Sequence, residues 1–298
     1  MKININRRKF IQNSVLMSSA FAVSNLFSDI NPKDKSIADI SAASSNDPAK
    51  NTRAAIKALG GMEKFVSNGD RVVLLPNPQG RQKGTSTNPA VVGETVKMCY
   101  EAGAAKVTVC SIHVKSRWRA TGIIEAVEKS GGEMFYPSVD KDWANVNVPA
   151  GKILKKTRVI KFALENDVFI NMPIAKQHGS ARFTCNIKNL MGVNDRDNEF
   201  HQGSEHLQQC ITDLSSLFNP TLCIVDANTI LIENGPFGPG NTASPNQVFA
   251  GTDMVALDAL CCGLISLDPK TVPHIVGAYK LGKGEIDLSK KVIRELKA

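Results

Sequence analysis

The residues best suited to chemistry follow an apolar segment in the middle of the chain. Residues 167–170 are typical of a buried strand, and the polar segment Pro173–His178 comes directly after it. A histidine among lysines stays neutral, because the neighbouring positive charges oppose its protonation, and a neutral imidazole can move a proton. Lysines in the same place can hold an anion. The catalytic candidates are His178 and Lys188, and the ligand-binding candidates are Lys176, Thr184 and Asn189.

One carboxylate lies in a segment that is apolar on every face of a helix. Asp258 has Met254–Leu257 before it and Ala259–Cys262 after it. A helix without a polar face is buried, and a buried carboxylate needs a cation, a metal or several hydrogen-bond donors. Lys176 or Lys188 would serve, as would a bound metal. Asp258 is therefore a third catalytic candidate, and a divalent metal is the one cofactor that it suggests.

Three further side chains stand where strands end or a helix begins. Asn77 follows the apolar segment 72–76, and Asp226 follows 222–225. Asp253 precedes a predicted helix, where a carboxylate can accept the first backbone N–H groups as an N-cap. Because groups that follow the strands of a parallel sheet can meet a ligand, all three are ligand-binding candidates, with the N-cap as the alternative for Asp253.

The elements that must position these residues alternate between strand and helix, which favours an α/β fold. Continuous apolar runs predict strands that are buried on both faces, as in a mostly parallel, Rossmann-like layered sheet flanked by helices. The predicted strands are 72–76, 106–110, 167–170, 222–225 and 248–251, and the predicted helices are 90–102, 122–130, 182–190, 204–218 and 254–265. Such sheets bind ligands beyond the carboxyl ends of their strands, so we expect the cleft there.

The motifs of several well-known sites are absent from the sequence. It contains no Walker A or G-x-G-x-x-G loop, no G-x-S-x-G and no histidine pair at helical spacing. No CxxC occurs, so the chain has no iron–sulfur motif, and Cys110 and Cys223 are interpreted as core residues. His201 and His206 lie in a polar segment that predicts a solvated loop. The candidate chemistry is proton transfer, or the binding of an anion together with a metal.

The N-terminus has the pattern of an export signal. Arg7 and Arg8 come before a short uncharged stretch of small and apolar residues over 14–27. This is typical of a twin-arginine signal peptide, and an amphipathic first helix is the poorer interpretation because the stretch has no polar face. The twin-arginine translocase is then a partner during export, and the mature protein is periplasmic. We expect the signal over 1–28, a polar linker over 29–50, and the α/β domain over 51–298, as one piece or two subdomains.

The charge distribution argues against nucleic acid as a partner. The formal net charge is +8, but four of the positive charges lie within residues 1–28, where there is no acidic residue. The rest of the chain carries +4, and only 6% of the residues are aromatic and able to stack on bases. No run reaches the roughly 18 apolar residues of a membrane span, so we expect no stable span after processing.

Several motifs, taken in order along the chain, resemble one known family. They are Pro76-Asn77 at a strand end, Pro-x-x-Lys-x-His at 173–178, Thr-x3-Lys-Asn-Leu-x-Gly at 184–192, Asp226, Gly235-Pro236, and Asp-x-Val-Ala-x-Asp at 253–258. From about residue 70 to residue 285, the chain resembles the domain-of-unknown-function 362 family. The resemblance supports the fold and the position of the site. Since many members join this domain to a ferredoxin-like module, it also implies an iron–sulfur protein as a partner.

These features together predict an exported enzyme that acts on a small anionic organic molecule, with metal assistance as an option. His178 or an aspartate would be the base, and the lysines would hold the anion. The alternative is a non-catalytic periplasmic binder or carrier of an anion, a metal or a cofactor. A redox partner of an iron–sulfur protein is a third interpretation, and it rests only on the family resemblance.

Overall fold

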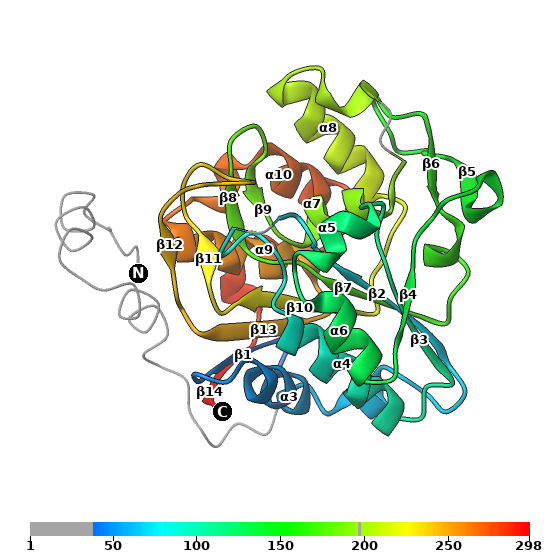
Figure 1. The fold of residues 1–298 in the computed structure, drawn as a ribbon. Helices are drawn as coiled ribbons and strands as arrows, with labels where there is room; N and C mark the ends of the chain where they lie inside the picture. Colours follow the sequence, from blue (N-terminus) through cyan, green and yellow to red (C-terminus); the bar gives the residue numbers. More distant parts are fainter. Residues whose placement is uncertain (1–37, 81, 196–197) are drawn as a thin grey trace, which may run out of the picture. The chain divides into compact units, whose positions relative to one another are not determined.

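The computed structural model describes residues 38–80, 82–195 and 198–298. The predicted signal over residues 1–28 lies outside them. The described residues belong to one unit, and its centre is an eight-stranded sheet between helices (Figure 1). The predicted α/β class, with a mostly parallel sheet flanked by helices, is confirmed.

The central sheet is mixed but mostly parallel. Its strands, in spatial order, are β14 (Ile293–Lys297), β1 (Ile40–Ser44), β13 (Gln247–Gly251), β10 (Leu222–Ala227), β7 (Val168–Met172), β2 (Arg71–Pro76), β3 (Lys106–Cys110) and β4 (Glu133–Phe135). Among these described strands, only β13 runs antiparallel to its neighbours, β1 and β10. Strands β2, β7 and β10 are buried almost throughout, because helices cover both faces of the sheet.

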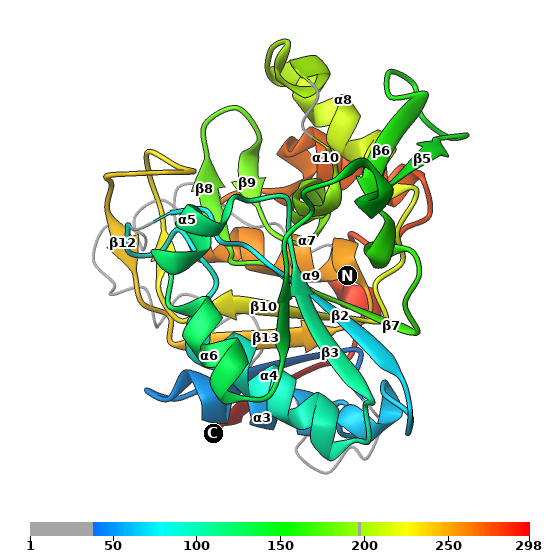
Figure 2. The same cartoon turned by 45° about the vertical axis from the view of Figure 1, so that its right-hand side comes forward.

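Two groups of helices form the outer layers (Figures 1 and 2). One face carries α3 (Pro48–Ala58), α4 (Pro89–Glu101) and α6 (Ile123–Lys129), and the other carries α7 (Asn186–Asn189) and α9 (Met254–Cys262), with α8 (Ser204–Ser215) and α10 (Pro273–Lys280) packed against them. A short helix and three hairpins lie outside the sheet: α5 (Lys115–Arg119), β5–β6 (Trp143–Asn147 and Lys156–Ile160), β8–β9 (Lys176–His178 and Arg182–Thr184) and β11–β12 (Ile230–Leu231 and Thr242–Ala243).

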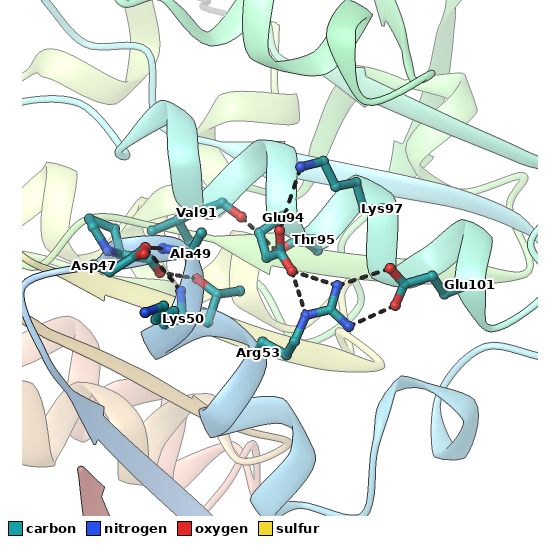
Figure 3. Close-up of polar contacts among 11 residues, drawn as sticks. Asp47, Ala49, Lys50, Arg53, Val91, Glu94, Thr95, Lys97 and Glu101 are labelled. Atoms are coloured by element: carbon teal, nitrogen blue, oxygen red, sulfur yellow. Dashed lines mark hydrogen bonds and ion pairs between the residues drawn. The ribbon is translucent and has the colours of Figure 1, made fainter. Parts of the chain in front are cut away.

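A side-chain cap and ion pairs occur on two helices of the first layer, α3 and α4, as Figure 3 shows. The carboxylate of Asp47 accepts two backbone N–H groups in the first turn of α3, at 3.0 and 3.2 Å. Arg53 on α3 donates to both carboxylate oxygens of Glu101 at 2.7 and 2.9 Å, and to Glu94 at 2.6 Å. Both glutamates belong to α4, so Arg53 joins the two helices at the surface, where such pairs contribute little to stability.

The polar linker predicted for residues 29–50 is wrong over its described part. Residues 40–44 form β1, which lies between β13 and β14, and α3 begins at Pro48. The strand reads Ile-Ser-Ala-Ala-Ser, and small and polar residues of this kind do not form an apolar run. Its Ser41 is nevertheless buried, because the hydroxyl donates to the carbonyl of Ala55 on α3 at 2.7 Å.

The helix predicted for residues 182–190 is wrong in its first half. Residues 182–184 form β9, which pairs with β8, and α7 spans only Asn186–Asn189 before a 3₁₀ turn over Leu190–Val193. Phe183, Ile187 and Leu190 are all buried, as the apolar spacing required. The apolar spacing therefore identified which side chains are buried. Phe183, however, lies on a strand of the β8–β9 hairpin and not on a helix. The other predicted strands and helices are present, with ends that differ by up to three residues.

All seven cysteines are buried. Desolvation opposes the thiolate and raises the pKa of Cys99 and of Cys110 to about 12. They are core residues, as predicted for Cys110 and Cys223. Across the part of the chain that the structure describes, no helix has the length and apolar character needed to cross a bilayer.

Candidate functional site

The segments that follow three neighbouring parallel strands meet at the carboxyl edge of the sheet and line a cavity of about 250 Å³. The segments after β2, β3 and β7 contribute Asn77, Gln79, Ser111, His113, His178 and Ser180. The wall is completed by Lys188 and Asn189 of α7, by Met191 and Gly192 after it, and by His201, Pro236 and Phe237. The cavity therefore lies beyond the carboxyl ends of the strands, where parallel sheets bind ligands.

Four of the nine predicted site residues line this cavity: Asn77, His178, Lys188 and Asn189. The other five lie outside its lining: Lys176, Thr184, Asp226, Asp253 and Asp258. Thr184 is buried beside Lys176 in the β8–β9 hairpin, and its hydroxyl oxygen has no hydrogen-bond partner among the described residues. The structure thus gathers four of the predicted residues that follow β2 and β7, and it leaves all three aspartates outside the lining.

His178 is held as a neutral ring with its proton on Nε2. The backbone N–H of Ala181 donates to Nδ1 at 3.1 Å, so Nδ1 must be the unprotonated nitrogen. Burial, together with the positive charges of Lys188 and Lys176, lowers the pKa of His178 to about 2. The ring therefore offers Nε2–H as a hydrogen-bond donor at every physiological pH.

His113 has the opposite arrangement of its ring proton. The hydroxyl of Ser111 donates to the carbonyl of Gly192 at 3.0 Å, and its oxygen lies 2.8 Å from Nδ1 of His113. Since the single hydroxyl proton is used by Gly192, the second contact requires Nδ1–H of His113 to donate to the serine oxygen. In the neutral ring, the lone pair is then on Nε2, which makes His113 a base.

The charges around the cavity favour an anion. Lys188 is partly buried on α7, and its charge helps to lower the pKa of both His178 and His274. The Arg117 guanidinium lies 6.0 Å from the ring centre of Phe237, which is part of the wall. Among the described residues that line the cavity there is no carboxylate. A cavity whose wall carries positive charge attracts negatively charged ligands.

Lys176 supports the cavity wall instead of lining the cavity. It is 1% exposed, and its Nζ donates to the carbonyls of Thr85 at 2.6 Å and Pro236 at 3.3 Å. Burial is the main cause of a pKa well below that of an ordinary lysine, and Lys188 adds to it. On the same loop, the N–H of Gly235 donates to Oε1 of Gln177 at 2.6 Å. These bonds hold the 235–237 segment against the hairpin that carries His178.

Asp258 is buried, as predicted, and the partners of its carboxylate are N–H groups and not a lysine. The carboxylate accepts the backbone N–H of Asn186 at 2.8 Å, the Asn186 side-chain amide at 2.9 Å and the backbone N–H of Ile187 at 3.1 Å. Burial raises its pKa to about 6, against the effect of these donors. The donors that a buried carboxylate requires come from α7, so Asp258 ties α9 to α7 and lies outside the lining of the cavity.

The other two aspartates also stabilise the fold. Asp226 accepts the backbone N–H of Asn88 at 2.7 Å and both the backbone and the side-chain N–H of Asn228, at 2.9 and 2.7 Å. Asp253 caps α9 by accepting two backbone N–H groups at 3.0 and 2.9 Å, and pairs with Lys291 at 2.8 Å. The N-cap alternative for Asp253 is confirmed.

Sequence reasoning missed nine of the thirteen lining residues, among them two histidines and a serine that contacts one of them. Ser111 and His113 directly follow β3, within a polar segment at a strand end, and this position was the signal that could have identified them. His201 was assigned to a solvated loop, and it is exposed but also belongs to the lining. Single histidines outside a motif give no pattern of their own.

A larger cavity, of about 490 Å³, lies between α8 and α10. Its lining includes Lys152, Lys270 and Lys280 and contains no histidine among the described residues. Nothing in it follows one of the parallel strands, so we place the candidate site in the smaller cavity. Across residues 38–298, apart from the three that are not described, no three side chains of His, Cys, Asp and Glu gather as ligands for a metal ion.

Comparison with known proteins identifies the family. A family model described as "Domain of unknown function (DUF362)" matches residues 72–263. The chain belongs to this family. The match to DUF362 contains every residue that lines the smaller cavity. A thylakoid-associated protein of Synechocystis sp. is 28% identical over 246 residues, covering 77% of this chain and 74% of that protein. The lactate racemase apoprotein from Thermoanaerobacterium thermosaccharolyticum aligns with a TM-score of 0.45 and 12% identity, over 80% of this DUF362 chain and 56% of the other chain.

Proposed function

We propose that the protein is an enzyme that moves a proton on a small organic anion. The observation that carries the proposal is a pair of histidines in one cavity, beside a partly buried lysine, whose hydrogen-bond partners call for the ring proton on opposite nitrogens. Acid–base catalysis needs a group that can take a proton and a group that can stabilise the charge which then develops. His113, His178 and Lys188 supply these functions.

Each residue has a separate role in this reaction. His113 takes the proton of the substrate through Nε2, while Ser111 holds its ring by accepting from Nδ1–H. His178 donates Nε2–H to the oxygen on which negative charge develops, as a neutral imidazole can in a site that excludes water. Lys188 binds the anionic group of the substrate, because it carries a positive charge in the wall of the cavity.

The experiment separates binding from turnover. Small carboxylates that fit 250 Å³ are titrated into the full-length protein by calorimetry, and bound compounds are analysed for conversion by NMR. We expect His113→Gln to lower turnover at least about 100-fold and to change affinity by no more than about threefold, because the base acts in the transition state. We expect Lys188→Met to weaken binding of every carboxylate.

Matched variants outside the cavity provide the controls. His206→Gln and Lys280→Met remove the same functional groups from places that do not belong to the lining, and both should leave turnover unchanged. If the wild-type protein binds carboxylates without converting any of them, the protein is a binder and the enzymatic proposal is wrong. Equal turnover in wild-type and His113→Gln protein would contradict the role of His113.

We also propose that residues 1–28 direct the folded chain through the twin-arginine translocase to the periplasm. The proposal is supported by Arg7 and Arg8 and by the uncharged stretch that follows them. Replacement of both arginines by lysine should leave the precursor in the cytoplasm, with its N-terminus uncut. Fractionation of the native host and mass spectrometry of the protein test this, and normal export of the variant would contradict it.

A further inference from the structure

A buried chain of four asparagine side chains leads from Asp258 to the cavity. Asn186 donates to the carboxylate of Asp258 at 2.9 Å, and Asn171 donates to the side-chain oxygen of Asn186 at 3.4 Å. Asn189 donates to the side-chain oxygen of Asn171 at 2.8 Å, and Asn77 donates to that of Asn189 at 3.0 Å. The four side chains come from β7, α7 and the segment after β2, and all are at most 7% exposed.

The direction of these hydrogen bonds is fixed by groups that can only accept. An ionised carboxylate has no donor, so the amide nitrogen of Asn186 must face Asp258. The amide nitrogen of Asn171 must face the backbone carbonyl of Asn186 at 2.9 Å, and that of Asn189 must face the carbonyl of Leu75 at 2.9 Å. Each asparagine then presents its oxygen to the next one along the chain.

Asn77 is the last member, and its position is held by its own backbone. Its backbone N–H donates to the hydroxyl oxygen of Thr87 at 2.9 Å, and this hydroxyl donates to the carbonyl of Met172 at 2.8 Å. Its amide nitrogen donates to the side-chain oxygen of Asn189, so its own side-chain oxygen remains to accept a hydrogen bond. That oxygen is buried, has no hydrogen-bond partner among the described residues, and belongs to a residue that lines the cavity.

We propose that the asparagine chain makes Asn77 an obligatory hydrogen-bond acceptor and that the substrate carries a hydroxyl or amino group that donates to it. The inference rests on the proposed function for the cavity and narrows its substrate to hydroxy or amino derivatives of small organic anions. A carbonyl or ether oxygen at the same place would face another acceptor. A buried acceptor without a donor is costly, so the cavity discriminates against analogues that lack the donor.

The test uses compounds of nearly equal size that differ only in this group. Butanoate, 2-oxobutanoate, 2-hydroxybutanoate, 3-hydroxybutanoate and 2-aminobutanoate are titrated by calorimetry at pH 7.5 into the full-length protein. We expect the best hydroxy or amino compound to bind about tenfold more tightly than butanoate or 2-oxobutanoate. Asn77→Ala should reduce this ratio to about one.

Two further variants keep the result interpretable. Asn77→Ser retains a donor for Asn189 while withdrawing the acceptor from the cavity, so it should lose the preference even if Asn77→Ala fails to fold. Gln79→Ala removes a different polar group of the lining and should change the affinity for all five compounds by one common factor. Melting temperatures of the variants report whether each one is folded.

The outcomes for this inference and for the enzymatic proposal are distinct. Equal affinity of wild-type protein for all five compounds, binding of none of them, or a preference that persists in folded Asn77 variants would overturn the inference. A clear preference without any conversion of the bound compound would leave the inference standing and contradict the enzyme. Conversion of a bound compound without a preference among the five would support the enzyme and overturn the inference.

Discussion

The buried carboxylate of Asp258 predicts a pH-dependent difference in stability between the wild-type protein and Asp258→Asn. Burial raises the pKa of this group from 3.8 to about 6 in the folded state. A carboxyl group with a raised pKa stabilises the fold below about pH 4, and this contribution is lost as the pH rises through 6. The difference between the two pKa values corresponds to about 3 kcal/mol, at about 1.4 kcal/mol for each pH unit. The asparagine variant has no proton to lose, so its stability lacks this dependence.

The introduced amide also carries a cost of its own. It replaces one of two accepting oxygens by a donor, although the carboxylate serves three N–H groups from Asn186 and Ile187. At least one buried N–H is left without an acceptor, which costs about 1 to 3 kcal/mol. We therefore expect Asp258→Asn to be less stable than the wild type at pH 4, and the difference to decrease by about 3 kcal/mol on going to pH 7.5.

Urea unfolding of both proteins between pH 4 and pH 7.5 measures this difference directly. Other titrating groups cancel when the two proteins are compared at each pH. Asp142→Asn is the matched control: Asp142 accepts the N–H groups of Ser138 and Val139, which lower its pKa, so its difference from the wild type should increase with pH. A difference for Asp258→Asn that is constant with pH, or that increases with pH, would refute the reasoning.

Three further predictions concern the parts that shape the cavity. His178 should remain a neutral ring with its proton on Nε2 from pH 4 to pH 8, because burial and nearby cations lower its pKa to about 2; ¹⁵N NMR of the ring detects any titration in this range, which would contradict the assignment. Thr87→Val removes the hydroxyl between Asn77 and Met172 and should lower the free energy of unfolding by about 1 to 3 kcal/mol, whereas an unchanged urea midpoint would show that this hydroxyl is dispensable. Gly235→Ala would place its Cβ against the carbonyl of Gln177, so this variant should bind the hydroxybutanoates more weakly in calorimetry. Gly263 has open space around it, so Gly263→Ala should not weaken binding. Equal affinities of the two variants would argue against a role for the 235–237 segment.

The sequence was sufficient for the parallel core and for the place of the site. Apolar runs such as 72–76 and 222–225 report burial on both faces, and the rule that ligands bind beyond the carboxyl ends of strands then locates the cavity. His178 was found in this way, because it ends the short polar segment that follows β7. Local patterns of this kind need no knowledge of long-range contacts.

The remaining features depend on contacts between distant residues. Strand β1 is specified by pairing with β13 and β14, over 200 residues away in sequence, and not by its own composition. The partners of Asp258 lie 71 and 72 residues before it, on a short helix that the sequence merged with β9. His113 becomes a site residue only because β3 lies next to β2. Neither a pairing nor a register of this kind is visible in the order of residues along one segment.

The most direct test of the proposed acid–base chemistry is the exchange of carbon-bound hydrogen with solvent. The hydroxy and amino compounds that bind are incubated with the protein in D₂O, and ¹H NMR follows the loss of each C–H signal. We predict that wild-type protein exchanges one C–H position of a bound compound, and that His113→Gln, but not His206→Gln, slows this exchange at least about 100-fold. Binding without exchange at any position, or equal exchange rates in wild-type and His113→Gln protein, would contradict the account.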